Sequence, residues 1–250
     1  MIAQEYLTKG TLTMFDGIHF TKENPYSYRE AKRLIRLLGN ELQACKAMHD
    51  IGVDPTGKRR PAITGSQDNR VWDSLPLRIA KGKAFTKYPH YTLSIREHDT
   101  IAAATIPNGV KGPFRKNLKE MGQSGFVDML IDIENRLKNV LNSSPKSRGM
   151  AYAMQRHYAS QSSPGVVDAH IHADIQTITK SNAKSISSRI KYQPQWVSAI
   201  YEVLIHKQSN IQFGIEVVFS YDCPQIQSSK AVKLYTEAFI AMKPLLDKSL

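Results

Sequence analysis

Hydrophobic residues recur at helical spacing in three stretches of the chain. The first stretch predicts an amphipathic helix over residues 28–49, and the second predicts a central helix over residues 126–141 that packs on the core. The third predicts a C-terminal helix over residues 229–243. That helix should end before Pro244, because proline cannot continue a helical hydrogen-bond ladder.

Between the helices the hydrophobic period changes to two, which is the period of a β-strand. The strand-like runs cover residues 75–85, 90–96, 101–106, 150–158, 166–179 and 211–221. Residues 196–206 are ambiguous, because β-branched residues share this run with helix-compatible spacing. The order of elements predicts an α+β fold with a mostly antiparallel sheet, a long N-terminal helix, a central helix and a C-terminal helix.

The chain is expected to form a single compact unit over residues 1–250. A segment rich in Ser, Pro and Lys at residues 142–149 separates two halves, about 1–143 and 150–250, in each of which strands precede a helix. No residue-level repeat supports a duplication. A chain of 250 residues that is 41% hydrophobic can bury a core without disulfides.

The cysteines and the N-terminal residues indicate a cytoplasmic protein. Cys45 and Cys223 match no metal-binding spacing, so a reducing compartment is expected. Residues 1–10 lack the basic and apolar regions of a signal peptide, and no run of about 18 apolar residues occurs. We therefore expect no membrane partner.

The net charge is +12, and most of it lies in the middle of the chain. Residues 51–200 hold 22 basic and 11 acidic side chains, a net charge of 22 − 11 = +11. A field of one sign attracts polyanions, which predicts DNA or RNA as the partner. Anionic lipid or an acidic protein would also satisfy such a field.

A cationic segment is the predicted site of contact with nucleic acid. Residues 52–73 are polar, lack an apolar period and are expected to form a long loop. The predicted phosphate contacts in this loop and after it are Lys58, Arg59, Arg60, Arg70, Arg78, Lys81, Lys83 and Arg96. Aromatic residues lie between them, as in platforms for RNA or single strands, although the rings could equally fill the core.

Ionisable and apolar residues alternate without interruption over residues 167–175. On a strand, Asp168, His170, His172 and Asp174 would project from one face. Such groups can serve as an acid–base pair, so these four are the candidate catalytic residues, with His170 or His172 as general base. The alternative is that this face is simply exposed to solvent, with ordinary cross-strand pairs.

The same strand face is a candidate metal site. Asp168, His170 and His172, together with Glu216 from a later strand, are the candidate ligands of a divalent metal such as Mg, Mn or Zn. A second set of carboxylates surrounds Glu216: Asp222 follows the same run, and Glu202 with His206 precedes it. Magnesium-dependent nucleases use such groups to activate water.

Asp168, His170 and His172 also resemble the Asp-x-His-x-His metal motif of the amidohydrolases. In that family the motif closes the first strand of a β/α barrel, and roughly 200 residues of alternating strands and helices should follow. Only 76 residues follow Asp174 in this chain of 250, which is too few for that barrel. The resemblance therefore extends to the ligand types alone.

The sequence leaves three functional hypotheses open. The first is a nucleic-acid-binding protein that also acts on its target, as a metal-dependent nuclease or another hydrolase of phosphodiester bonds. The second is a non-catalytic subunit of a nucleoprotein complex, with other protein subunits as partners. The third is a metal hydrolase that acts on small molecules.

Overall fold

Six antiparallel strands form one sheet in the order β1-β2-β3-β6-β4-β5. The computed structural model describes residues 14–59, 70–81, 87–107, 113–157, 167–179, 194–206 and 210–248. The strands are β1 (Arg70–Leu75), β2 (His90–Arg96), β3 (Asp99–Ile106), β4 (Arg148–Arg156), β5 (Val167–Asp174) and β6 (Ile211–Ser220). Because β6 pairs with β3 on one side and β4 on the other, it joins the strands of the two halves.

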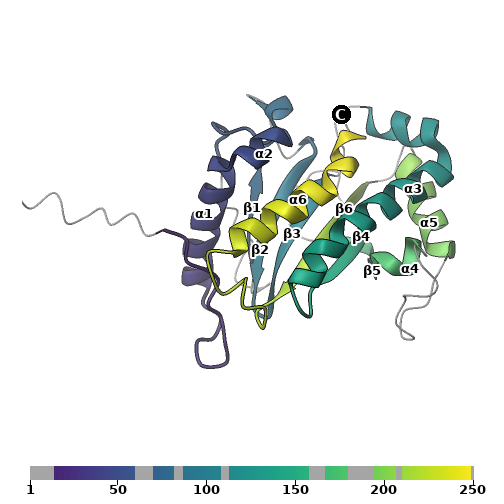
Figure 1. Ribbon diagram of the computed structural model, residues 1–250. Helices are drawn as coiled ribbons and strands as arrows, with labels where there is room; N and C mark the ends of the chain where they lie inside the picture. The colour runs from purple at the N-terminus through teal and green to yellow at the C-terminus, as the bar shows by residue number, and fades with distance from the viewer. Residues whose placement is uncertain are drawn as a thin grey trace, which may run out of the picture.

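The helices lie on one side of this sheet (Figure 1). They are α1 (Tyr28–Ala44), α2 (Lys46–Asp50), the 3-10 turn η2 (Arg78–Ala80), α3 (Phe114–Ser143), α4 (Ile175–Thr179), α5 (Pro194–Ile205) and α6 (Ala231–Asp247). Helices α1, α6 and α3 cross the sheet, and α5 packs on α3. We call this side the helix layer. No helix in the described ranges is long and apolar enough to span a membrane.

Strand residues alternate between two environments. On β6, the odd-numbered Phe213, Ile215, Val217 and Phe219 are buried in the large core that the sheet shares with the helix layer. The even-numbered positions point to the opposite side, which we call the helix-free face because no described helix packs on it. The centre of that face is a small buried apolar cluster formed by Ile101, Ala103, Met150 and Val218.

The predicted fold class is confirmed: the protein is α+β with an antiparallel sheet, a central helix and a C-terminal helix. The predicted N-terminal helix over 28–49 is interrupted at Cys45, whose extended backbone separates α1 from α2. The ambiguous run at 196–206 lies mostly in α5.

Two predicted strands are wrong in their extent. The run over 75–85 is not one strand, because β1 ends at Leu75 and Pro76, which cannot donate to a ladder, precedes the turn η2. The run over 166–179 contains both β5 and the short helix α4, which begins after Asp174. An Asp174 oxygen accepts a hydrogen bond from the Gln176 amide at 3.0 Å, which favours the change from strand to helix.

The long helices also differ from their predicted limits. Helix α3 begins at Phe114, before the predicted start, and Gly122 divides it with a left-handed backbone angle of φ 68°. Helix α6 continues through Pro244 to Asp247, so the predicted end is wrong. Proline lies in the last turn there, where it removes only one amide from the ladder.

The predicted loop over 52–73 is partly ordered around a buried ion pair. Arg59 Nη1 lies 2.6 Å from Asp73 Oδ2, and their side chains are 7% and 0% exposed. The Arg59 guanidinium also donates to Gln43 Oε1 at 3.1 Å and to Asn40. A side chain at Gly39 would collide with Arg59, because its Cβ would lie 1.5 Å from Nη1. The pair therefore joins this loop to α1 and β1.

Replacement of Arg59 by Met should destabilise the protein by about 3–5 kcal/mol, because it leaves the buried Asp73 carboxylate without its cation. Chemical denaturation measures the loss. Lys58→Met is the matched control, since Lys58 is exposed, and it should change the free energy of unfolding by less than about 0.5 kcal/mol. Equal losses in the two variants would contradict a structural role for Arg59.

The loss caused by Arg59→Met should be larger at pH 8 than at pH 5. Burial raises the pKa of Asp73 to about 6, although Arg59 opposes the shift, so removal of Arg59 should raise this pKa further. A carboxyl group whose pKa is higher in the folded than in the unfolded chain adds stability as the pH falls through the folded pKa. Denaturation of both proteins at the two pH values tests this, and Arg59→Met/Asp73→Asn should lose the dependence.

Candidate nucleic-acid interface

Every basic residue of the six strands other than histidine is an arginine on the helix-free face. The strands contain Arg70, Arg96, Arg148 and Arg156 and no lysine. All four occupy the positions that alternate away from the core, and each begins or ends its strand. Arginine binds phosphate with two parallel donors, so its concentration on one face is suited to an anionic ligand.

Three of these arginines lie at the same end of the sheet. Arg70 is directly opposite Arg96 in the β1–β2 pairing. Arg148 is opposite Val218 on β6, which places it two residues further from this end of the sheet than Arg70 and Arg96. Trp72 follows Arg70 on the same face. We call Arg70, Arg96 and Arg148 the arginine row. Like charges directly opposite each other destabilise a sheet, and the ion pair of Arg96 with Asp99 offsets part of this repulsion.

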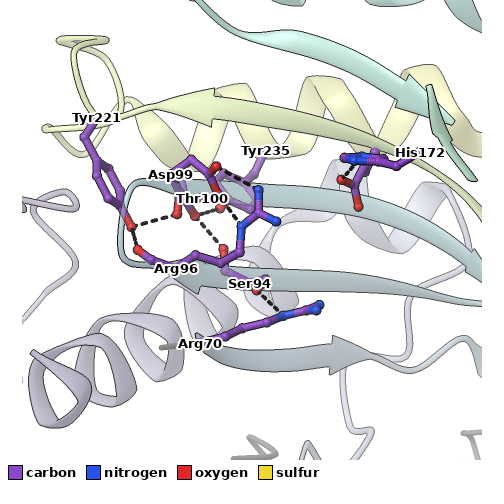
Figure 2. Close-up of polar contacts among 9 residues, drawn as sticks. Arg70, Ser94, Arg96, Asp99, Thr100, His172, Tyr221 and Tyr235 are labelled. Atoms are coloured by element: carbon purple, nitrogen blue, oxygen red, sulfur yellow. Dashed lines mark hydrogen bonds and ion pairs between the residues drawn. The ribbon is translucent and has the colours of Figure 1, made fainter. Parts of the chain in front are cut away.

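Hydrogen bonds fix two members of the arginine row (Figure 2). Arg70 Nε donates to Ser94 Oγ at 2.9 Å. Arg96 forms a two-pronged ion pair with Asp99, at 2.5 Å and 2.7 Å. The Tyr221 hydroxyl lies within hydrogen-bond distance of the Arg96 and Asp99 carbonyl oxygens, at 2.5 Å and 2.8 Å. The turn between β2 and β3 is therefore stabilised by an ion pair between its side chains and by hydrogen bonds to its backbone carbonyl groups.

The same turn is tied to the helix layer. The buried Thr100 hydroxyl donates to the Ser94 carbonyl at 2.7 Å and contacts the Tyr235 hydroxyl of α6 (Figure 2). Burial raises the pKa of Tyr235, which therefore stays neutral. These contacts restrict the movement of the β2–β3 turn, which carries Arg96 of the arginine row.

Two histidines and a glutamate meet near the opposite edge of the face. The rings of His170 and His172 on β5 stack, with centroids 5.8 Å apart and planes at 12°. His172 Nε2 lies 2.9 Å from Glu216 Oε1, and the Glu216 side chain is 11% exposed. A carboxylate only accepts hydrogen bonds, so Nε2 carries the hydrogen. We call these three residues the histidine corner.

Tyr152 forms the inner wall of this corner. It pairs with His172 on one side and with Gly214 on the other. Its ring lies over Gly214, where a Cβ would come within 2.5 Å of the ring, and its hydroxyl bonds Thr105 Oγ1 at 3.0 Å. The glycine therefore allows the tyrosine to reach across β6.

Burial lowers the pKa of His170, and the neighbouring His172 lowers it further, while Glu216 opposes the shift. The lowered pKa favours the neutral ring of His170, which has a lone pair that can accept a proton. His172 is bound to Glu216, so the two rings have different surroundings although they are two residues apart. Different surroundings for two titratable groups are typical of acid–base pairs.

The other predicted catalytic residues, Asp168 and Asp174, make separate contacts. Asp168 Oδ1 contacts His157 Nδ1 at 3.0 Å, and both side chains are about half exposed. The β4–β5 register shifts at Asp168, because Gln155 pairs with Ala169 and Arg156 with Val167. Asp174 caps the start of α4, and burial raises its pKa while the hydrogen bond from Gln176 opposes the shift.

The predicted metal ligands are divided between two contacts. His172 pairs with Glu216, whereas Asp168 pairs with His157. Within the ranges that the structure describes, no three His, Cys, Asp or Glu side chains are placed to hold one metal ion. The second carboxylate set is dispersed as well: Asp222 pairs with Lys146 at 2.7 Å, Glu202 lies on α5, and His206 follows that helix. A metal role for these residues stays a prediction.

The predicted phosphate contacts fall into four groups. Arg70 and Arg96 belong to the arginine row, and Arg59 is buried against Asp73, so it cannot contact phosphate without breaking that pair. Arg60 and Lys83 lie outside the described residues. Lys58, Arg78 and Lys81 are exposed. They lie in the two segments that an isolated β-bridge between Val53 and Leu77 joins.

Three residues of the interface did not emerge from the sequence as candidates: Arg148, Arg156 and Tyr152. Arg148 lies in the segment 142–149, which was predicted as a boundary between the two halves. Tyr152 and Arg156 lie in the predicted strand over 150–158, whose period of two places them on one face. The signal was therefore present in the spacing. Which face this was could not be decided, because both faces of β4 carry apolar residues.

The chain matches no known family. Comparisons with family models, with curated proteins and with solved structures each found no match. The functional argument therefore depends on the geometry of the helix-free face.

Gly214→Ala should destabilise the protein by about 1–3 kcal/mol, because the new Cβ would overlap the ring of Tyr152. Thermal denaturation measures the loss. In a Tyr152→Ala background the same substitution should cost less than about 0.5 kcal/mol, since the overlapping ring is gone. A cost that does not depend on Tyr152 would show that the glycine is needed for another reason.

Proposed function

We propose that the protein binds nucleic acid on the helix-free face. The observation that carries the proposal is the arginine row, in which Arg70 and Arg96 are opposite each other and Arg148 lies at the same end of the sheet. The guanidinium groups of Arg70 and Arg148 can contact the phosphates of a polyanion, whereas Arg96 would first have to give up part of its ion pair with Asp99. The net charge of +12 would add long-range attraction.

Trp72 supports a contact with unpaired bases. It follows Arg70 on the same face, is opposite Ser94, and is only partly buried. A tryptophan ring next to a phosphate-binding arginine can stack on a base while the arginine holds the backbone. Duplex nucleic acid keeps its bases stacked on one another, so we propose a single-stranded target or an RNA loop.

A non-catalytic subunit of a nucleoprotein complex remains the second candidate. It would use the same arginine row, since the row provides binding without chemistry. Turnover of the nucleic acid by the protein would contradict this second candidate, because a non-catalytic subunit binds RNA and leaves it intact.

The test is a titration of fluorescent single-stranded RNA, single-stranded DNA and duplex DNA at 50 to 200 mM salt. Replacement of Arg70 and Arg148 by Gln should weaken single-strand binding at least about tenfold. It should also lower the slope of log K against log salt by about 1.4, because two phosphate contacts are lost. The protein should bind single strands more tightly than the duplex.

The control for this experiment replaces Lys116 and Lys233, which are exposed on α3 and α6 of the helix layer, by Gln. It removes the same charge and should reduce the salt slope by less than half as much. Equal effects of both double variants would mean that net charge alone attracts the polyanion. Absence of salt-sensitive binding would refute the proposal.

A further inference from the structure

We infer that the histidine corner cleaves RNA by acid–base catalysis through the 2′-hydroxyl group of the target. The inference rests on the proposed function, because the RNA must first bind the helix-free face. It goes further by naming RNA as the substrate and by assigning a role to each side chain of the corner.

The spacing of the two imidazoles supports this reaction. Their ring centroids are 5.8 Å apart on one face of β5. A phosphodiester has its attacking and leaving oxygens on opposite sides of phosphorus, so two groups at about this separation can each reach one of them. Neither ring is deeply enclosed, since His170 and His172 are both exposed residues.

Glu216 gives the two rings different tasks. Its carboxylate accepts a hydrogen bond from Nε2 of His172 at 2.9 Å and so fixes the ring orientation. We assign this oriented, hydrogen-bearing ring as the acid. His170 has no such carboxylate contact among the hydrogen bonds and ion pairs found in the described residues, and we assign it as the base.

Arg156 supplies a cation next to the corner. Met154 pairs with His170, and Arg156 follows two residues later on the same face, roughly 7 Å along the strand. Its guanidinium contacts the Gln212 side-chain oxygen at 3.3 Å. A guanidinium at this place can stabilise the charge that develops on the phosphoryl oxygens.

The arginine row lies within reach of the same RNA. Tyr152, which pairs with His172, lies four residues along β4 from Arg148, or roughly 13 Å. A strand held by Arg148 can therefore place a nearby phosphate over the two rings.

The reaction proceeds by proton transfer and substitution at phosphorus. The neutral ring of His170 takes the proton of the 2′-hydroxyl, and the 2′-oxygen forms a bond to the adjacent phosphorus. The bond from phosphorus to the 5′-oxygen breaks, and that oxygen takes a proton from His172. The products are a 2′,3′-cyclic phosphate and a 5′-hydroxyl, and proton exchange with water restores both rings.

The test substrate is a labelled DNA oligonucleotide that contains a single uridine, compared with the same oligonucleotide containing only deoxynucleotides. We expect cleavage after the uridine alone, with a 2′,3′-cyclic phosphate end and with no loss of rate in EDTA. His170→Ala and His172→Gln should each lower the rate at least about 100-fold. His157→Ala is the matched control, because it removes another histidine that contacts a carboxylate, that of Asp168 on β5, and it should keep the rate within about twofold.

Glu216 is a positioning residue, since it acts through His172. Glu216→Gln should lower kcat at least about tenfold and leave KM within about twofold. A purely structural effect would instead appear as a lower melting temperature with unchanged kcat in the folded fraction. Circular dichroism of every variant identifies those that fail to fold, and His170→Ala, at an exposed position, is the variant least affected by that problem.

The outcomes separate the two proposals. If RNA binds but stays intact, the histidine corner is not catalytic and the binding function stands. Cleavage of the all-DNA strand, or cleavage that EDTA abolishes, would overturn the 2′-hydroxyl mechanism and favour a metal-dependent nuclease. Absence of RNA binding would refute both the proposed function and the inference that rests on it.

Discussion

The position of β6 between β3 and β4 is the constraint on which both faces of the sheet depend. Its odd-numbered residues complete the core beneath the helix layer, and its even-numbered residues bring Gly214 and Glu216 to the helix-free face. A shift of one residue would exchange these two sets. Because Phe213 and Phe219 are fully buried, such a shift is strongly disfavoured. The packing of the core therefore fixes the place of Glu216 beneath His172.

The sequence predicts the elements with a regular period and fails where a single residue interrupts it. Strands β2 and β3 lie close to their predicted limits. Strand β1 was missed because Asp73, a charged residue, occupies a core-facing position, and only the distant Arg59 makes its burial tolerable. Secondary-structure propensity describes each segment by itself. An ion pair between two segments that are distant in the sequence therefore cannot be predicted from either segment alone.

The candidate site shows the same division between local and non-local information. Alternation along β5 correctly places His170 and His172 on one face, since only the strand period is needed. The partner of His172 could not be derived in this way, because Glu216 is 44 residues away and its position depends on the strand order. The pairing of Arg59 with Asp73 could not be predicted for a related reason. Its charge was visible in the sequence, but its burial was not.

The burial of Glu216 distinguishes the histidine corner from an ordinary solvent-exposed edge. Charged side chains on an edge strand such as β5 are common, because they prevent association of sheets, and Asp168 at its register shift fits that role. Glu216 cannot serve it, since β6 is an interior strand and the residue is 9% exposed. A buried carboxylate is costly unless a partner stabilises its charge. Its contact with His172 therefore indicates that Glu216 orients the imidazole, and not that it only keeps the sheet edge from associating with other sheets.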